Sequence, residues 1–96
     1  WNTAFGSLSL NANTTGERNV GVGYNALVLN TTGVRNSAVG MDALGANTSG
    51  GYNTALGNNS LGANTTASDN TAIGYNSLLS NTTGAGNTSM GASSSP

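Results

Sequence analysis

The sequence predicts an all-β protein, a parallel β-solenoid in which 17-residue coils stack on one another. Asn recurs at residue 2 and then every 17 residues up to residue 87, with no insertion or deletion. Gly recurs with the same period, and a large apolar residue stands immediately before each of these glycines. A fixed period of this kind indicates units that bury their faces only against neighbouring units.

Two apolar rows follow from this period when each repeat is numbered from its Asn as position 1. Position 4 is always large and apolar, position 5 is always Gly, and position 9 is Leu in five repeats. We expect positions 4 and 9 to meet inside the coil as its structural core. The expected core residues are Phe5, Val22, Val39, Leu56, Ile73 and Met90 at position 4, and Leu10, Leu27, Leu44, Leu61 and Leu78 at position 9.

Two short strands are predicted in each coil, at positions 1–5 and 8–11, with turns at positions 6–7 and 12–16. The abundant Gly, Asn, Thr and Ser disfavour helix, and short segments bounded by Gly and Asn are typical of strands. Alternation along the first strand separates positions 2 and 4 from positions 1, 3 and 5. We therefore expect the small residues at positions 3 and 5 to form a smooth outer face that contacts another copy.

Two rows of Asn are expected to form ladders of side-chain amides. Stacking in register places like residues about 4.8 Å apart, a spacing at which amides hydrogen-bond along the stack. Turn geometry is the other reason for Asn here, since Asn tolerates positive φ, and the two roles are compatible. The rows are Asn2, Asn19, Asn36, Asn53, Asn70 and Asn87 at position 1, and Asn13, Asn30, Asn47, Asn64 and Asn81 at position 12.

One domain is predicted, a solenoid over residues 1–91. Residues 92–96 abandon the repeat, and we interpret them as an exit into a linker or a C-terminal tail. The large residues at positions 4 and 9 are few for a chain of 96 residues, so the area buried within one chain is thin. This favours a homo-oligomer.

Composition excludes several classes of function. The net charge is −1, so we expect neither nucleic-acid binding nor attraction to anionic lipid. His, Cys and Lys are absent, so the usual catalytic bases and nucleophiles are missing, and we expect no enzyme, cofactor or metal. No apolar run approaches the roughly 20 residues of a membrane span, so no membrane insertion of this segment is expected. The charged residues, interpreted as turn residues, are Glu17, Arg18, Arg35, Asp42 and Asp69.

The repeat resembles those of known surface fibres. Asn-Thr-Ala-Ile-Gly-Tyr-Asn-Ser-Leu at 70–78, followed by Asn-Thr-Thr-Gly at 81–84, is similar to repeats of phage tail fibres and bacterial surface fibres. Its Thr-Ala-Ile-Gly part also resembles the Ser-Val-Ala-Ile-Gly repeat of YadA-type trimeric autotransporter adhesin heads. The resemblance covers residues 1–91 and implies a homotrimer of left-handed parallel β-rolls. The period of 17 is longer than in the adhesin heads, which leaves a triangular or interwoven β-helix open.

These observations predict a structural and adhesive segment of a fibre, extracellular, on a bacterial cell surface or a virion. Its partners would be further copies of itself and, through exposed turns, a host-surface glycan or receptor. Aromatic side chains at the turns are candidates for that contact, although such side chains also pack on neighbouring turns. They are Trp1, Tyr24, Tyr52 and Tyr75.

Three alternatives stay open. Stacked Thr at positions 13 and 14 suggest an ice-binding solenoid, although adjacent Thr side chains point to opposite sides. Unfinished coils at both ends suggest an end-to-end filament. Asn-x-Ser/Thr sequons suggest a disordered, glycosylated linker, although turns made of Asn and Thr generate sequons by composition. The sequons begin at Asn13, Asn30, Asn47, Asn58, Asn64, Asn81 and Asn87.

Overall fold

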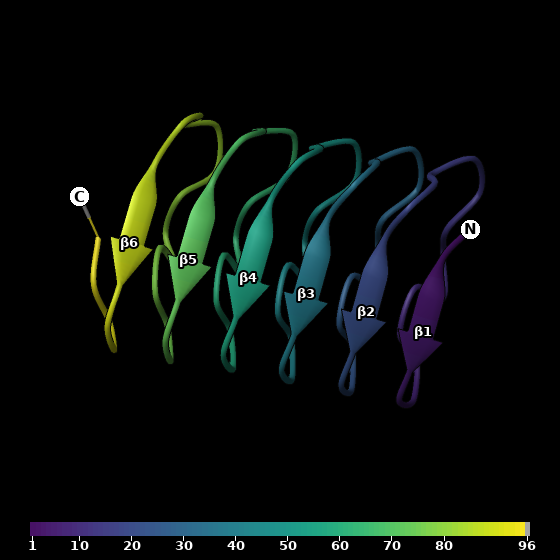
Figure 1. The fold of residues 1–96 in the computed structure, drawn as a ribbon, viewed down its shortest axis with the longest axis horizontal. Coiled ribbons are helices and arrows are strands. Elements are labelled where there is room, and N and C mark those ends of the chain that lie inside the picture. Colours follow the sequence, from purple (N-terminus) through teal and green to yellow (C-terminus); the bar gives the residue numbers. More distant parts are fainter. Residues whose placement is uncertain (96) are drawn as a thin grey trace.

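The computed structural model describes residues 1–95 and shows a stack of coils with one parallel sheet along its length (Figure 1). Each residue of a strand pairs with the residue 17 positions later, as Thr54 does with Thr71 and Leu56 with Ile73. The predicted all-β parallel solenoid is thereby confirmed, with about five turns. Its strands are β1 (Thr3–Phe5), β2 (Val20–Val22), β3 (Ser37–Val39), β4 (Thr54–Leu56), β5 (Thr71–Ile73) and β6 (Thr88–Met90), adjacent in that order.

Positions 8–11 form tight turns, and the predicted second strand is wrong. In the first coil, the amides of Ser9, Asn11 and Asn13 each donate to the carbonyl three residues earlier, at 3.1–3.2 Å. Leu8 and Leu10 lie at φ 63° and 53°, the left-handed region that the third residue of a type II turn occupies. Because each turn reverses the chain locally, no extended segment can form on this side of the coil.

Backbone hydrogen bonds join the coils outside the sheet as well. The amide of Leu27 donates to the carbonyl of Ala43 in the next coil at 3.1 Å. At the opposite corner, the amides of residues 31, 32 and 33 all converge on the carbonyl of Thr48, at 2.9–3.2 Å. Three successive amides around one oxygen form a nest that holds its partial negative charge. Each coil is therefore tied to the next along both sides of its perimeter.

The apolar core is a column of leucines at position 9. Leu27, Leu44 and Leu61 are fully buried, and they form one cluster with buried alanines such as Ala38 and Ala55 at position 3 of the strands. This half of the predicted core is confirmed. The leucines enter the core from turns rather than from strands, at φ 50–53°.

The other half of the predicted core is wrong, because position 4 points outward. Phe5, Leu56 and Met90 keep 75%, 47% and 68% of their surface exposed, Val39 is also exposed, and Val22 and Ile73 are half-buried. A three-residue strand has one inward position, and here it is position 3. The narrow coil already holds the leucine and two Asn side chains, so only a small residue fits there.

The expected smooth outer face is wrong for the same reason. Position 3 lies inside the coil, and the position-5 glycines serve the stacking of coils. Gly40 adopts φ 131°, and a Cβ there would lie 2.7 Å from the backbone of Gly57 in the next coil. Any side chain at this position would force the coils apart.

Truncation of the leucine column should destabilise the fold far more than truncation of an exposed leucine. We expect Leu44→Ala to lower the free energy of unfolding by about 3 kcal/mol, since it opens a cavity in the core. Leu29 lies outside the sheet and is 50% exposed, so Leu29→Ala should cost under about 1 kcal/mol. Urea unfolding followed by circular dichroism measures both. Equal losses would contradict the assignment of the core.

Candidate functional site

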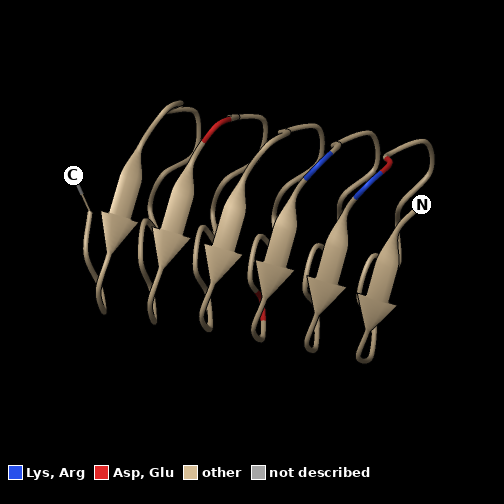
Figure 2. Cartoon of the chain, viewed as in Figure 1, with Lys and Arg blue, Asp and Glu red and all other residues tan. Residues whose placement is uncertain are grey.

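Within residues 1–95, no three residues among His, Cys, Asp and Glu lie close enough to hold a metal ion. The charged residues lie on turns close to the ends of the strands, and none lies within a strand (Figure 2). Nor does any helix within residues 1–95 have the length and apolar character to cross a bilayer. The candidate sites are therefore surfaces.

The position-1 Asn side chains connect backbone to backbone inside the coil. Asn19 Oδ1 accepts the backbone N–H of Asn36 at 2.9 Å, and Asn36 Nδ2 donates to the carbonyl of Gly50 at 2.8 Å. Asn19, Asn36, Asn53 and Asn70 are fully buried. The amide-to-backbone contact along the stack recurs from Asn2 to Asn87. These residues are structural, and they satisfy groups that the narrow interior hides from water.

The position-12 Asn side chains form a direct amide ladder. Asn47 Nδ2 donates to Asn30 Oδ1 at 2.9 Å, and Asn64 Nδ2 donates to Asn47 Oδ1 at 3.0 Å. The same Nδ2 of Asn47 also donates to the carbonyl of Gly50, which closes the turn of its own coil. Equivalent ladder contacts join Asn13 to Asn30 and Asn64 to Asn81.

Burial of this ladder bears on the sequons. The Nδ2 atoms that would carry a glycan at Asn30, Asn47 and Asn64 are buried and hydrogen-bonded. A glycan there is incompatible with the folded coil. This favours the interpretation that the sequons arise from the composition of the turns.

The position-13 threonines also use their hydroxyl groups within the stack. Thr31 Oγ1 donates to the carbonyl of Thr48 at 3.2 Å, and Thr48 Oγ1 to that of Thr65 at 3.3 Å. These hydroxyls are thus partly occupied by the protein. The exposed hydroxyl row of position 14 is a single file along a corner, which gives little support to an ice-binding face.

The outward row of position 4 forms an exposed apolar stripe along the sheet, which we call the outer stripe. It runs over neighbouring strands with no charged residue on the sheet (Figure 2). Large apolar side chains exposed in a continuous row are unusual on an isolated soluble domain, and they mark surfaces that contact a partner. The outer stripe comprises Phe5, Val22, Val39, Leu56, Ile73 and Met90.

A second surface feature lies at position 17, where aromatic and cationic side chains share one edge. The Arg18 guanidinium lies 5.4 Å from the ring centroid of Trp1, and that of Arg35 lies 5.4 Å from the ring of Tyr52. Both arginines lie on turns, as interpreted from the sequence, and their aromatic partners are a further finding. The period contained the signal, since all four residues occupy the same repeat position.

A groove of about 530 Å³ opens on the outer turns. The groove forms where position 10 has no side chain, at Gly45 and Gly62 in the two central coils. In the coils on either side, Val28 and Leu79 occupy the same position. A carboxylate and amides line its edge, yet it contains no base or nucleophile pair.

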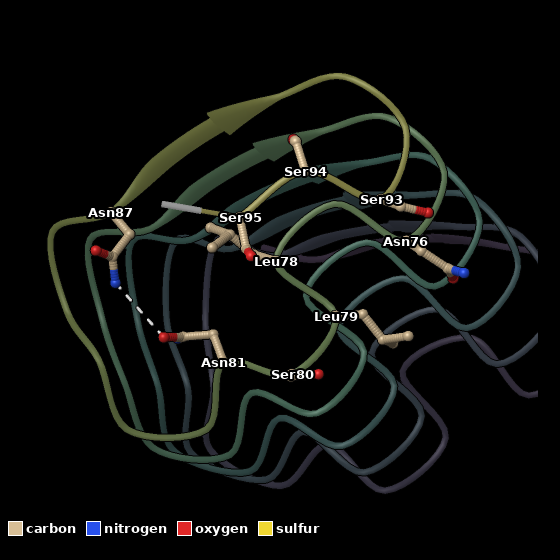
Figure 3. A pocket seen from close by; sticks show the side chains of 9 residues that line it. All are labelled: Asn76, Leu78, Leu79, Ser80, Asn81, Asn87, Ser93, Ser94 and Ser95. Atoms are coloured by element: carbon tan, nitrogen blue, oxygen red, sulfur yellow. Dashed lines mark hydrogen bonds between the residues drawn. The ribbon is translucent and has the colours of Figure 1, made fainter.

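The open end of the last coil forms another hollow, of about 460 Å³ (Figure 3). Asn87 Nδ2 donates to Asn81 Oδ1 across it at 3.5 Å, and Leu78 lies at its wall. The equivalent space in earlier coils is filled by the leucine and the Asn of the following coil. The hollow therefore continues the interior of the solenoid.

Removal of one ladder amide should be costly. Asn47→Ala leaves the buried Asn64 Nδ2 and Asn30 Oδ1 short of a partner, and we expect a loss of about 2–4 kcal/mol in unfolding free energy. Asn58 makes one exposed hydrogen bond, to the carbonyl of Met41, so Asn58→Ala should cost about 0.5 kcal/mol. Urea unfolding of the two variants compares them. A mild Asn47→Ala would show that the ladder contributes little.

Comparison with known proteins gave no further guidance. No family model matches the chain, and searches of curated proteins and of solved structures also found no match. What the chain does must therefore be inferred from the surfaces above.

Proposed function

We propose that this chain is a rigid structural and adhesive segment of an extracellular fibre, on a bacterial cell or a virion, in which three copies associate through the outer stripe. The observation that carries this proposal is the combination of continuous coil stacking with an exposed apolar row on the sheet. The role is mechanical: the segment extends the fibre and presents its turns to the surroundings.

Rigidity follows from the hydrogen bonds between coils. The amides of positions 2, 9 and 13–15 donate to the next coil, those of position 5 donate to the preceding coil, and the amide ladder adds side-chain bonds inside. Bending the rod would stretch several of these bonds at each junction. The described stack measures 31 × 22 × 16 Å, and the same pattern extends to any length without changing the contacts.

Association of several copies follows from the outer stripe. Val39 and Leu56 present flat, uncharged surface that water solvates poorly. A standard interface takes about 800 Å² per partner, which is comparable with the whole 31 × 22 Å face of the stack. Contact between copies would therefore cover most of the sheet. Three copies around one axis bring their stripes together, the arrangement that the resemblance to adhesin heads also implies.

Particle mass tests the assembly. We expect light scattering to give three times the 9.4 kDa chain mass, and low-resolution images to show a short rod. Val39→Ser/Leu56→Ser should shift the particle to the monomer mass, because it removes the apolar centre of the stripe.

Leu29→Ser provides the matched control, since Leu29 is equally exposed but lies off the sheet. It should leave the mass unchanged. A monomeric native chain, or an assembly indifferent to the double stripe variant, would rule out association through the stripe. End-to-end filaments in the images would instead favour the filament alternative.

A further inference from the structure

The only two cationic side chains of the protein lie in one row on one edge of the rod. Arg18 and Arg35 both occupy position 17, in consecutive coils, with φ of 60° and 55°. Residues at the same position stack about 4.8 Å apart. Figure 2 shows the two arginines on adjacent turns at the same edge. The two arginines thus stand on adjacent coils of one edge, with Glu17 next to Arg18 in the chain.

Each guanidinium stacks on an aromatic ring that lies away from the other arginine. Arg18 stacks on Trp1 in the preceding coil, and Arg35 stacks on Tyr52 in the following coil, where Arg35 Nη1 also donates to Tyr52 Oη at 2.7 Å. The order along the row is aromatic, cation, cation, aromatic. Stacking occupies the face of a guanidinium, whereas its N–H donors lie in the plane, and Tyr52 takes up only one of those of Arg35.

Neither cation of this edge is paired directly with a carboxylate in the part of the chain that the structure describes. Asp69 shares the row but stands two coils beyond Arg35, which is about 10 Å. Like charges one coil apart repel each other. An anionic ligand at this edge would reduce that repulsion.

We propose that the edge formed by Trp1, Arg18, Arg35 and Tyr52 binds an acidic polysaccharide, with a carboxylate held by the two guanidinium groups and the sugar rings packed on the exposed aromatic side chains. Carboxylates match the planar guanidinium fork, and sulfate esters share this chemistry. Trp1 and Tyr52 are 90% and 52% exposed, which leaves apolar surface for the C–H faces of a sugar.

A saccharide fits this edge better than other polyanions. Nucleic-acid binding neutralises many phosphates along a track, whereas this protein has two cations and a net charge of −1. An acidic peptide offers carboxylates but has no need of the flanking rings. The proposal rests on the fibre function, because an extracellular segment meets the acidic polysaccharides of cell surfaces.

Trp1 provides a direct reporter, since it is the single Trp and contacts Arg18. Titration of the full 96-residue chain with polygalacturonate at low ionic strength should change its fluorescence in a saturable manner. Uncharged dextran should have no effect. Added salt of about 0.3 M should weaken the binding severalfold, because screening reduces the attraction between exposed charges.

Variants locate the site by isothermal titration calorimetry, which does not depend on Trp1. Arg18→Gln/Arg35→Gln should weaken binding at least about tenfold, because two charge-assisted contacts are lost. A control variant adds Ser49→Arg and Thr66→Arg to that double substitution, which restores the net charge at exposed positions away from the edge. This control should not recover binding. Arg18→Lys/Arg35→Lys keeps the charge without the fork and should bind more weakly than the native chain. Circular dichroism confirms that each variant is folded.

Several outcomes would overturn the proposal. Equal binding by the variant with relocated charges would show general electrostatic attraction without a site. Equal binding of poly-glutamate would assign the edge to acidic peptides, and binding of dextran sulfate without polygalacturonate would exclude the carboxylate. A native chain that shows the trimer mass but binds no acidic polymer would refute this inference alone and leave the fibre function intact.

Discussion

The register between coils depends on buried side-chain amides. The interior of a 17-residue coil is narrow, with leucines at one side and two Asn rows at the other. Each ladder amide, such as Asn47, finds its partners one coil away at about 3 Å. A shift of one residue between coils would leave these groups unpaired, at about 1–3 kcal/mol for each. Apolar packing between the stacked leucines does not depend on direction in this way. The polar rows therefore fix the alignment from which the sheet, the glycine row and the outer surfaces all follow.

Periodicity predicted the stacking but not which side of the strand faces inward. An alternation of period two leaves its phase open, and a strand of three residues offers too few positions to decide it. Assigning the largest side chain to the interior is the usual choice, and at Leu56 it was wrong because Leu44 and Leu61 already fill the core from the turns. Those leucines adopt left-handed backbone angles that bulky residues rarely occupy. Their residue type therefore gave no indication of a turn.

The edge of aromatic and cationic residues was predictable in part. The period places Trp1, Arg18, Arg35 and Tyr52 in one row, and stacking then makes neighbours of residues that are 17 apart in the chain. What the period cannot supply is the direction of each side chain. Arg18 leans toward the preceding coil and Arg35 toward the following one, a choice set by where the aromatic rings stand and by repulsion between the two charges.

The division between constant and varied positions of the repeat separates folding from function in this chain. Positions 1, 5, 9 and 12 repeat the same residue along the described stack, apart from the last coil, and each meets its own equivalent in the next coil through a buried or sterically tight contact. A substitution there disturbs two junctions at once. Position 17 instead runs from Trp1 through two arginines to Tyr52, and it points outward, where one coil can change without disturbing the next. An outward row of this kind can therefore differ in chemistry from coil to coil while the buried rows keep the coils in register.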